Sequence, residues 1–287
     1  MSNLISHNTY GKSGIRILKV MRDNAVHEIK ELTVSVQLEG DFEKVHTEGD
    51  NSNVLPTDTM KNTVYVLAKE HPVNTIEEFG SYLAKHFLKN NEQVSKTVVE
   101  IEEKLWNRIL IDDKSSDNLK PHEHSFVNAG NENRTAKITA SGNTISIQSG
   151  IKDLLVLKTS GSGFENYVKD KYTTLRETND RVFSTSIKAV WHYTNDNADY
   201  FSVCGMVRKI ILETFAQHHS LSVQQTLYVI GNNIVETIKD VREISLTMPN
   251  KHYLLFNLGQ FNIENNNEIF VPTDEPFGLI EATVQRQ

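Results

Sequence analysis

The chain has 287 residues, of which 38% are hydrophobic and 23% are charged, so it can bury a core in one large domain or two ordinary ones. Acidic residues outnumber basic ones by 37 to 30 and no run of Lys or Arg occurs, which disfavours a nucleic-acid partner. The single cysteine, Cys204, lies in an apolar helical pattern, so we expect a buried, inert thiol and no disulfide. Without a signal peptide or an apolar run of about 18 residues, we expect a soluble, intracellular chain with no membrane partner.

The first half of the chain alternates between strand and helix patterns. At 31–39, apolar residues alternate strictly with polar ones, as in a half-buried strand. Thr75 with Glu78 forms a capping box that starts a helix. The predicted elements are strands at 14–20 and 31–39, helices at 57–70 and 75–90, and strands at about 95–104 and 134–140.

The second half repeats this order. Ser222 with Gln225 forms another capping box, and 183–193 alternates as a strand. The predicted elements are strands at 143–150, 153–160 and 183–193, helices at about 201–217 and 222–238, and strands at 242–248 and 279–285, with loops at 112–122 and 259–267. Strands, two helices and strands, twice over, predict an α+β duplication with antiparallel sheets and helices on one face.

The stretch "LPTDTMKNTVYVLAKE" is more polar than a helix start requires. Pro56 suits the start of a helix, and either Thr57 or Asp58 could cap the first turn. Five polar side chains nevertheless occupy six positions between Thr57 and Asn62. The pattern leaves two interpretations open, a solvated helix start or part of a site that binds an anion and moves protons.

Other motifs favour structural interpretations when taken alone. His122 and His124 could share a metal from one face of a strand, but no third ligand is evident nearby, so a polar loop or strand edge is favoured. The glycine-rich stretch "TSGSGFENY" lacks the third glycine of a dinucleotide motif and the Lys of a P-loop. We therefore predict no metal and no nucleotide at these stretches.

Three further stretches could bind an anionic ring. "YTTLRETNDRVFSTS" carries Arg176 and Arg181 among hydroxyls. "HSLSVQQTLY" places Val223 and Gln224 at the first two positions of a helix, where backbone N–H groups lack intrahelical acceptors. "SLTMPNKHYLLF" interrupts an apolar strand with polar residues at 250–252. On pattern alone, each is more often structural than functional.

Taken together, these stretches resemble the urate oxidase (uricase) family. The motifs "YGK", "TDTMKNT", "VKDKYTTLRETNDR", "SVQQTLY" and "PNKHY" occur in the family's order between Tyr10 and Arg286. Each motif is weak alone, and the combination is specific. The resemblance implies two tandem tunnelling-fold (T-fold) repeats, residues 10–141 and 142–287, which oligomerise into a tunnel-shaped barrel as a homotetramer.

The resemblance also implies an activity and a binding site. Urate oxidases oxidise urate, a flat purine monoanion, with O2 and water to 5-hydroxyisourate and H2O2 in purine degradation, and they use no metal or organic cofactor. Arg181 would form a planar two-point contact with one edge of urate, Gln224 would pair with the opposite edge, and Val223 would donate its backbone N–H. Phe164 would stack on the ring. Asn250 would lie above it, where O2 or water sits.

The same resemblance assigns a catalytic proton relay to Lys12, Thr57 and His252. A threonine hydroxyl is too weak an acid to act alone, and a lysine serves as its base only if its pKa falls from about 10.4 towards neutrality. Asp58 would contact the substrate, chiefly through its backbone N–H. Thr57 and Asp58 are expected to cross a subunit boundary, so the active site would lie between chains and Thr57 would meet the Lys12 of a neighbouring chain.

Two alternatives remain open. A non-catalytic urate- or purine-binding T-fold protein would keep the Arg181–Gln224 clamp, but it has no use for a proton relay. Another T-fold purine or pterin enzyme that uses zinc would need a Cys/His set that Cys204 and "PHEH" do not supply. The chain ends in "TVQRQ" rather than a Ser-Lys-Leu type tripeptide, so we expect a cytoplasmic protein, or a peroxisomal one if the C-terminus was trimmed.

Overall fold

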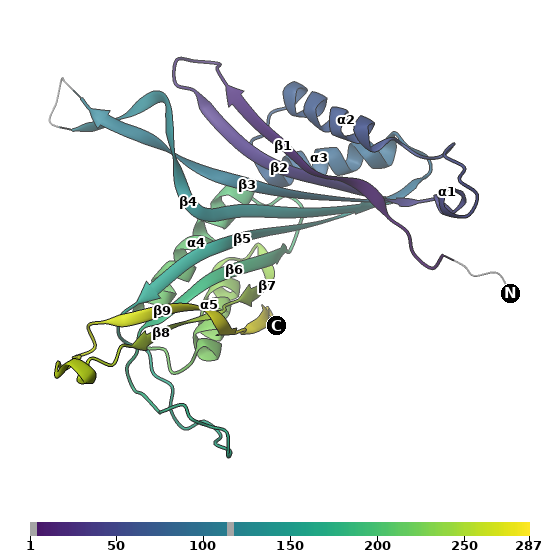
Figure 1. The fold of residues 1–287 in the computed structure, drawn as a ribbon. Helices are drawn as coiled ribbons and strands as arrows, with labels where there is room; N and C mark the ends of the chain where they lie inside the picture. Colours follow the sequence, from purple (N-terminus) through teal and green to yellow (C-terminus); the bar gives the residue numbers. More distant parts are fainter. Residues whose placement is uncertain (1–4, 114–117) are drawn as a thin grey trace. The chain divides into compact units, whose positions relative to one another are not determined.

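The computed structural model describes residues 5–113 and 118–287, which fold into two compact units that divide between Gly150 and Ile151. Figure 1 shows the path of the chain through mixed helices and strands. Each unit follows the predicted order of strands, two principal helices and strands. The α+β class with antiparallel pairing is confirmed, whereas the predicted repeat boundary at residues 141 and 142 stays a prediction.

The first unit contains four long strands that pair antiparallel in chain order, and the first part of a fifth. Its strands are β1 (Tyr10–Met21), β2 (Glu28–Gly40), β3 (Val94–Asp112) and β4 (Leu119–Ser141), paired in that order. Its helices are α1 (Glu43–Thr47), α2 (Thr57–Glu70) and α3 (Ile76–Lys89). Helix α2 packs on β1 and α3 packs on β3 and β4 (Figure 1). The alternating apolar residues of β2 are all buried, as the period of two predicts.

In the second unit, two successive strands pair along one edge of β6. Its elements are β6 (Phe183–Tyr193), α4 (Tyr200–Gln217), α5 (Val223–Thr237), β7 (Val241–Thr247), β8 (Asn250–Leu255), η1 (Gly259–Phe261), β9 (Phe270–Gly278) and β10 (Glu281–Gln285). Strand β6 pairs antiparallel with β7 and, near its start, with β8. Strand β7 then pairs with β10, and β8 pairs with β9. Helix α5 packs against α4, β7 and β10.

Several sequence-based predictions need correction. The predicted break near 151–152 is wrong, because β5 (Thr144–Lys158) runs through it with Asp153 in a positive-φ conformation at 60°. The loop predicted at 112–122 is wrong in part, since β4 already begins at Leu119; residues 114–117 lie outside the described residues. Strands β8 and β9 and helix α1 were not predicted. The buried state of Cys204 is confirmed, and the loop predicted at 259–267 is confirmed except that its first three residues form the short helix η1.

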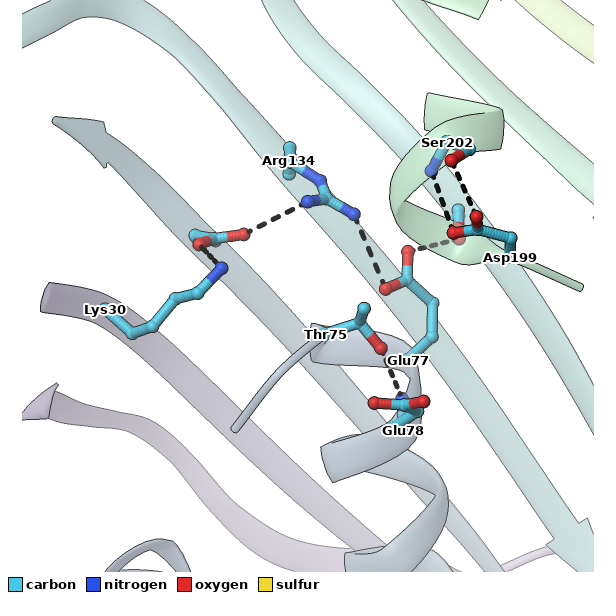
Figure 2. A network of polar contacts seen from close by, with 9 residues as sticks. Lys30, Thr75, Glu77, Glu78, Arg134, Asp199 and Ser202 are labelled. Carbon is cyan, nitrogen blue, oxygen red and sulfur yellow. Dashed lines mark hydrogen bonds and ion pairs between the residues drawn. The ribbon is translucent and has the colours of Figure 1, made fainter. Parts of the chain in front are cut away.

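A buried network of charges ties α3 to the sheet of the first unit. Glu77, in the first turn of α3, accepts a 2.5 Å hydrogen bond from the Ser149 hydroxyl and lies 3.6 Å from the Arg134 guanidinium. Arg134 lies 3.7 Å from Glu103, which pairs with Lys30 at 2.6 Å. Figure 2 shows the Arg134 guanidinium between the side chains of Glu77 and Lys30. The network contains two cations and two carboxylates, so each buried charge has a neighbour of opposite sign, as burial requires.

Neither a membrane-spanning helix nor a metal-binding cluster is found in the described part of the chain. Within residues 5–113 and 118–287, no helix is both long and apolar enough to cross a bilayer. Over the same ranges, no group of three His, Cys, Asp or Glu side chains is arranged to hold a metal ion. His122 and His124 lie on β4 with ring centroids 4.5 Å apart, and the His27 ring lies 5.9 Å from His124.

Candidate active site

Lys12 lies on β1 directly before an irregularity of the strand. It pairs with Val36 of β2, and the register then shifts between Lys12 and Ile15. A Cβ on Gly11 would lie 1.9 Å from the Val36 carbonyl oxygen, so only glycine allows β1 to approach β2 this closely. Gly14 takes a positive φ of 70°, which suits the bulge. The sequence "YGKSG" therefore fixes the backbone on both sides of a partly buried Lys12.

The start of α2 is held next to β1 by a tyrosine. The Leu55 backbone N–H donates to the Tyr10 hydroxyl at 2.9 Å, and burial raises the pKa of that hydroxyl. Pro56 occupies the N-cap position, and no side chain caps the helix. The prediction that Thr57 or Asp58 caps the first turn is therefore wrong. Thr57 is instead the first residue of α2, and its side chain is partly buried.

Asp58, the second residue of α2, has positively charged side chains near its carboxylate. Its carboxylate accepts hydrogen bonds from Lys61 and, at 3.0 Å, from Asn62. The hydrogen bond from Lys61 is the main reason that the pKa of Asp58 is lowered, and the charge of Lys12 lowers it further. Lys12 therefore lies close to the start of α2 in its own chain. The expectation that Lys12 and Thr57 reach one site from different chains stays a prediction.

In the second unit, a glycine-rich segment, residues 160–164, lies hydrogen-bonded between two other segments. On one side, Phe164 and Thr178 exchange backbone hydrogen bonds of 2.7 and 3.2 Å. On the other side, Gly163 donates to the Ser220 carbonyl at 2.8 Å, and Ser220 donates to the Gly161 carbonyl at 2.9 Å. The motif "TSGSGF" thus joins the segment before Arg181 to the segment before α5.

The side chains of Arg181 and Phe164 lie close together in the second unit. The Arg181 guanidinium carbon lies 5.7 Å from the centroid of the Phe164 ring, and burial lowers the pKa of Arg181. Within the described residues, its buried Nε has no hydrogen-bond partner. The Tyr167 ring stacks on Phe164, with centroids 4.9 Å apart and planes 13° apart. A buried unpaired N–H beside an aromatic ring can bind a planar acceptor.

The start of α5 offers backbone donors as predicted. The Ser222 hydroxyl accepts from the Gln225 N–H at 3.1 Å, so Ser222 caps the helix as predicted. The Gln225 side chain accepts from the Leu221 N–H at 3.0 Å, one residue before the N-cap position that the capping box predicts. Val223 and Gln224 are consequently the first two helical residues, and their N–H groups have no acceptor within the helix. The Val223 side chain is buried, whereas the Gln224 side chain is exposed and free to meet a ligand.

Strand β8 carries the two polar residues of the site that come from "PNKHY". Asn250 pairs with Thr185 of β6 on one side and Gly278 of β9 on the other. His252 follows on the same strand, and its carbonyl accepts from the Thr273 hydroxyl at 3.3 Å. Both residues are partly buried. Because β6 begins two residues after Arg181, its pairing with β8 connects Arg181 to Asn250 through neighbouring strands.

The predicted site residues thus fall into two sets. Lys12, Thr57 and Asp58 lie in the first unit, at the β1 bulge and the start of α2. The second unit holds the other set, which comprises Phe164, Arg181, Val223, Gln224, Asn250 and His252. Two residues that hold this second set, Tyr167 and Asp180, were not singled out from the sequence. Their contacts join segments that are far apart along the chain, and no sequence pattern indicates that those segments meet.

Comparisons with known proteins agree with these motifs. A family model described as uricase matches residues 8–139 and 147–281. The uricase of Arthrobacter globiformis is 42% identical over 284 residues, which cover 99% of this chain and 90% of that protein. The uricase of Dictyostelium discoideum is 40% identical over 288 residues, covering 100% of this chain and 98% of that protein.

Solved structures give the same result. The crystal structure of uricase from Arthrobacter globiformis matches with a TM-score of 0.93 and 42% identity, covering 100% of this chain and 96% of that one. A uricase from Bacillus fastidious matches with a TM-score of 0.86 at 24% identity, covering 97% and 93%, and supports the fold alone. The family model and the full-length relatives together establish that the chain belongs to the uricase family.

Proposed function

We propose that this chain is a urate oxidase that converts urate, O2 and water to 5-hydroxyisourate and H2O2. Family membership supports the activity, since relatives at 42% and 40% identity are uricases. The observation that carries the proposal for the site is Arg181, whose buried, unpaired Nε lies beside the Phe164 ring. Urate is flat and anionic, so it suits a guanidinium for its edge and an aromatic ring for its face.

The second unit would bind the substrate. Arg181 would donate to one edge of urate, and the exposed Gln224 side chain would pair with the opposite edge. The Val223 backbone N–H at the start of α5 would donate a further hydrogen bond, which the positive end of the helix dipole strengthens. Asn250 would bind O2 or water above the ring. Val223 and Gln224 lie on a capped helix and Asn250 lies on a paired strand, so these groups need little reorganisation on binding.

Lys12 and Thr57 of the first unit, together with His252 of the second unit, would move protons. Urate must lose protons as O2 accepts electrons, and Lys12 beside Thr57 offers a base and a hydroxyl that can relay them, with His252 as the third member. The absence of a side-chain cap at α2 supports this role, because the Thr57 hydroxyl is not committed to the helix. The nearby cations Lys12 and Lys61 would favour an anion at this helix start, where Asp58 offers its backbone N–H.

We further propose that the protein is a homotetramer whose active sites lie between subunits, with Lys12 and Thr57 supplied by one chain. An exposed apolar surface on the β8–β9 hairpin and the loop that joins its strands supports assembly. Its large exposed side chains are Leu254, Leu255, Phe256, Phe261, Ile263, Ile269, Val271, Phe277 and Leu279. So much apolar surface on one hairpin is typical of an interface that a second copy covers.

The activity is tested with protein that a chelator has stripped of metal. We expect loss of the ultraviolet absorbance of urate, one O2 consumed per urate, and peroxide formed. A non-catalytic urate-binding protein would bind urate in equilibrium dialysis without consuming O2. Another T-fold purine or pterin enzyme would turn over a different ring or need added metal. Either result would refute the proposed oxidation.

The composition of the site is tested by mixing two inactive variants. Thr57→Ala and Arg181→Ala chains are unfolded together at equal amounts and reassembled. If Thr57 and Arg181 of one site come from different chains, the mixture should recover about one quarter of wild-type activity. Random assembly then gives about one site in four in which both residues are intact. Thr57→Ala mixed with Lys12→Met should recover none, since we infer that one chain supplies both residues. Recovery by the second mixture and not the first would reverse the assignment.

A further inference from the structure

Asp180 lies next to Arg181 and binds the glycine-rich segment 160–164 from the side. Its carboxylate accepts a hydrogen bond of 2.9 Å from the Ser160 hydroxyl and one of 2.8 Å from the Gly161 backbone N–H. The bond from Ser160 is the largest reason that the pKa of Asp180 is lowered, with further bonds from backbone N–H groups including that of Arg181. The carboxylate therefore stays ionised and accepting across the neutral range.

The segment that Asp180 binds could not take this path without glycine. Gly161 has a φ of 75°, which other residues rarely adopt. A Cβ on Gly163 would lie 3.1 Å from the carbonyl oxygens of both Thr178 and Asn179. The close approach of the two segments thus depends on small residues on one side and on the Asp180 carboxylate on the other.

Further bonds carry this arrangement to the two groups that would hold the substrate. The backbone pair between Phe164 and Thr178 sets the position of the aromatic ring, and the Thr178 hydroxyl donates to the Asp180 carbonyl at 2.6 Å. Arg181 follows directly, with its guanidinium carbon 5.7 Å from the Phe164 centroid. Asp180 thereby fixes the distance between an aromatic ring and a guanidinium that must contact the same flat molecule.

We propose that Asp180 is a positioning residue for substrate binding, which holds Phe164 and Arg181 at the spacing that a purine anion needs. It would act without touching the substrate, because each oxygen of its exposed carboxylate accepts a hydrogen bond from the loop. Its loss loosens the ring and the guanidinium together, so urate binding weakens, while Lys12 and Thr57 of the proton relay, which lie in the other unit, keep their positions. This inference rests on the proposed function.

Asp170 offers a matched control. It is an exposed aspartate whose carboxylate accepts from the Tyr172 N–H at 2.9 Å and from the Thr173 hydroxyl at 2.9 Å. Its pKa is lowered by the same kinds of bond. Asp170 therefore has the chemistry of Asp180 and lies in the same stretch between Phe164 and Arg181, but its bonds stay within its own turn.

The experiment compares Asp180→Asn, Asp170→Asn and Arg181→Lys in the full-length enzyme. Urate affinity is measured without O2, and KM and kcat are measured in air. We expect Asp180→Asn to raise the dissociation constant and KM about tenfold, the effect of losing a hydrogen bond to a charged group, while kcat changes less than about threefold. Hydrogen exchange at residues 160–164 should accelerate in Asp180→Asn alone. Asp170→Asn should match wild type in every measurement.

The outcomes separate this inference from the proposed function. If Arg181→Lys weakens binding and Asp180→Asn does not, Asp180 is no positioning residue, although the site stands. If both variants bind urate as wild type does, the proposed site is wrong. If Asp170→Asn weakens urate binding as much as Asp180→Asn does, any loosening of this stretch has the same result, and the specific positioning role of Asp180 is refuted. Should Asp180→Asn fail to fold, Ser160→Ala removes one bond to the same carboxylate and should raise KM about two- to threefold with kcat unchanged; an unchanged KM there overturns the inference.

Discussion

Thr57 allows the structural and catalytic roles of one side chain to be separated. If Thr57 capped α2, its replacement by alanine would cost about 1 kcal/mol of stability, the usual effect of losing a cap. Pro56 occupies the N-cap position and the helix has no side-chain cap, so that cost should be absent. We expect Thr57→Ala to change the free energy of unfolding by less than about 0.5 kcal/mol, as for substitutions away from such features.

The catalytic effect should be much larger. If the Thr57 hydroxyl relays a proton to or from Lys12, Thr57→Ala and Lys12→Met should each lower kcat about 100-fold, and the double variant should be little worse than either. This non-additivity is expected because the two side chains would act as a unit. Turnover is measured by O2 consumption, at protein concentrations that keep the oligomer intact.

Thr75 provides the matched control for this experiment. It is a true helix cap, since its hydroxyl accepts from the Glu78 N–H at 3.2 Å at the start of α3. Thr75→Ala should therefore lose about 1 kcal/mol in urea unfolding and keep its turnover per folded molecule. The reasoning is refuted if Thr57→Ala behaves like Thr75→Ala, with stability lowered and turnover intact.

Three other substitutions test separate parts of the molecule. Arg181→Lys keeps the charge and loses the planar two-point contact, so urate binding should weaken by about 1.5–3 kcal/mol in anaerobic titration. In the double variant, Gln224→Ala should weaken binding by less than it does alone. Gly11→Ala puts a Cβ 1.9 Å from a backbone oxygen of β2, so the strand must shift and kcat should fall with the displaced lysine that follows it. Glu77→Ala leaves a buried guanidinium without one of its carboxylates and should cost about 3–5 kcal/mol in urea unfolding, whereas the exposed Glu78→Ala should stay within about 0.5 kcal/mol.

Secondary structure was predictable wherever local chemistry fixes it. The Ser222 box places the start of α5 at Val223, and the strict alternation at 183–193 coincides with β6. These signals are local, because a cap or a pleat depends on residues a few positions apart. The break predicted inside β5 failed because Gly150 and Asp153 resemble turn residues, whereas the strand accommodates Asp153 at a positive φ.

Strands β8 and β9 escaped prediction for a different reason. Their large apolar side chains, such as Leu254 and Val271, are exposed, while the partly buried positions include Asn250 and His252. A pattern of apolar residues inside and polar residues outside therefore does not hold for this hairpin. Such an inversion arises where a partner covers the outer surface or where polar side chains face a ligand, and neither is encoded in the periodicity of one chain.

The candidate site posed a harder problem, since every one of its residues also fits a local structural role. Thr57 could have been a cap, Arg181 an exposed charge and Val223 an ordinary first helical residue. In the folded chain those roles are filled by others: Pro56 starts α2, and Asp180 holds the loop beside Arg181. Some polar groups are held in place by neighbouring residues but have no structural partner of their own. These groups are available to bind a substrate. Single stretches of sequence cannot reveal this, because it depends on which neighbour has already met each local need.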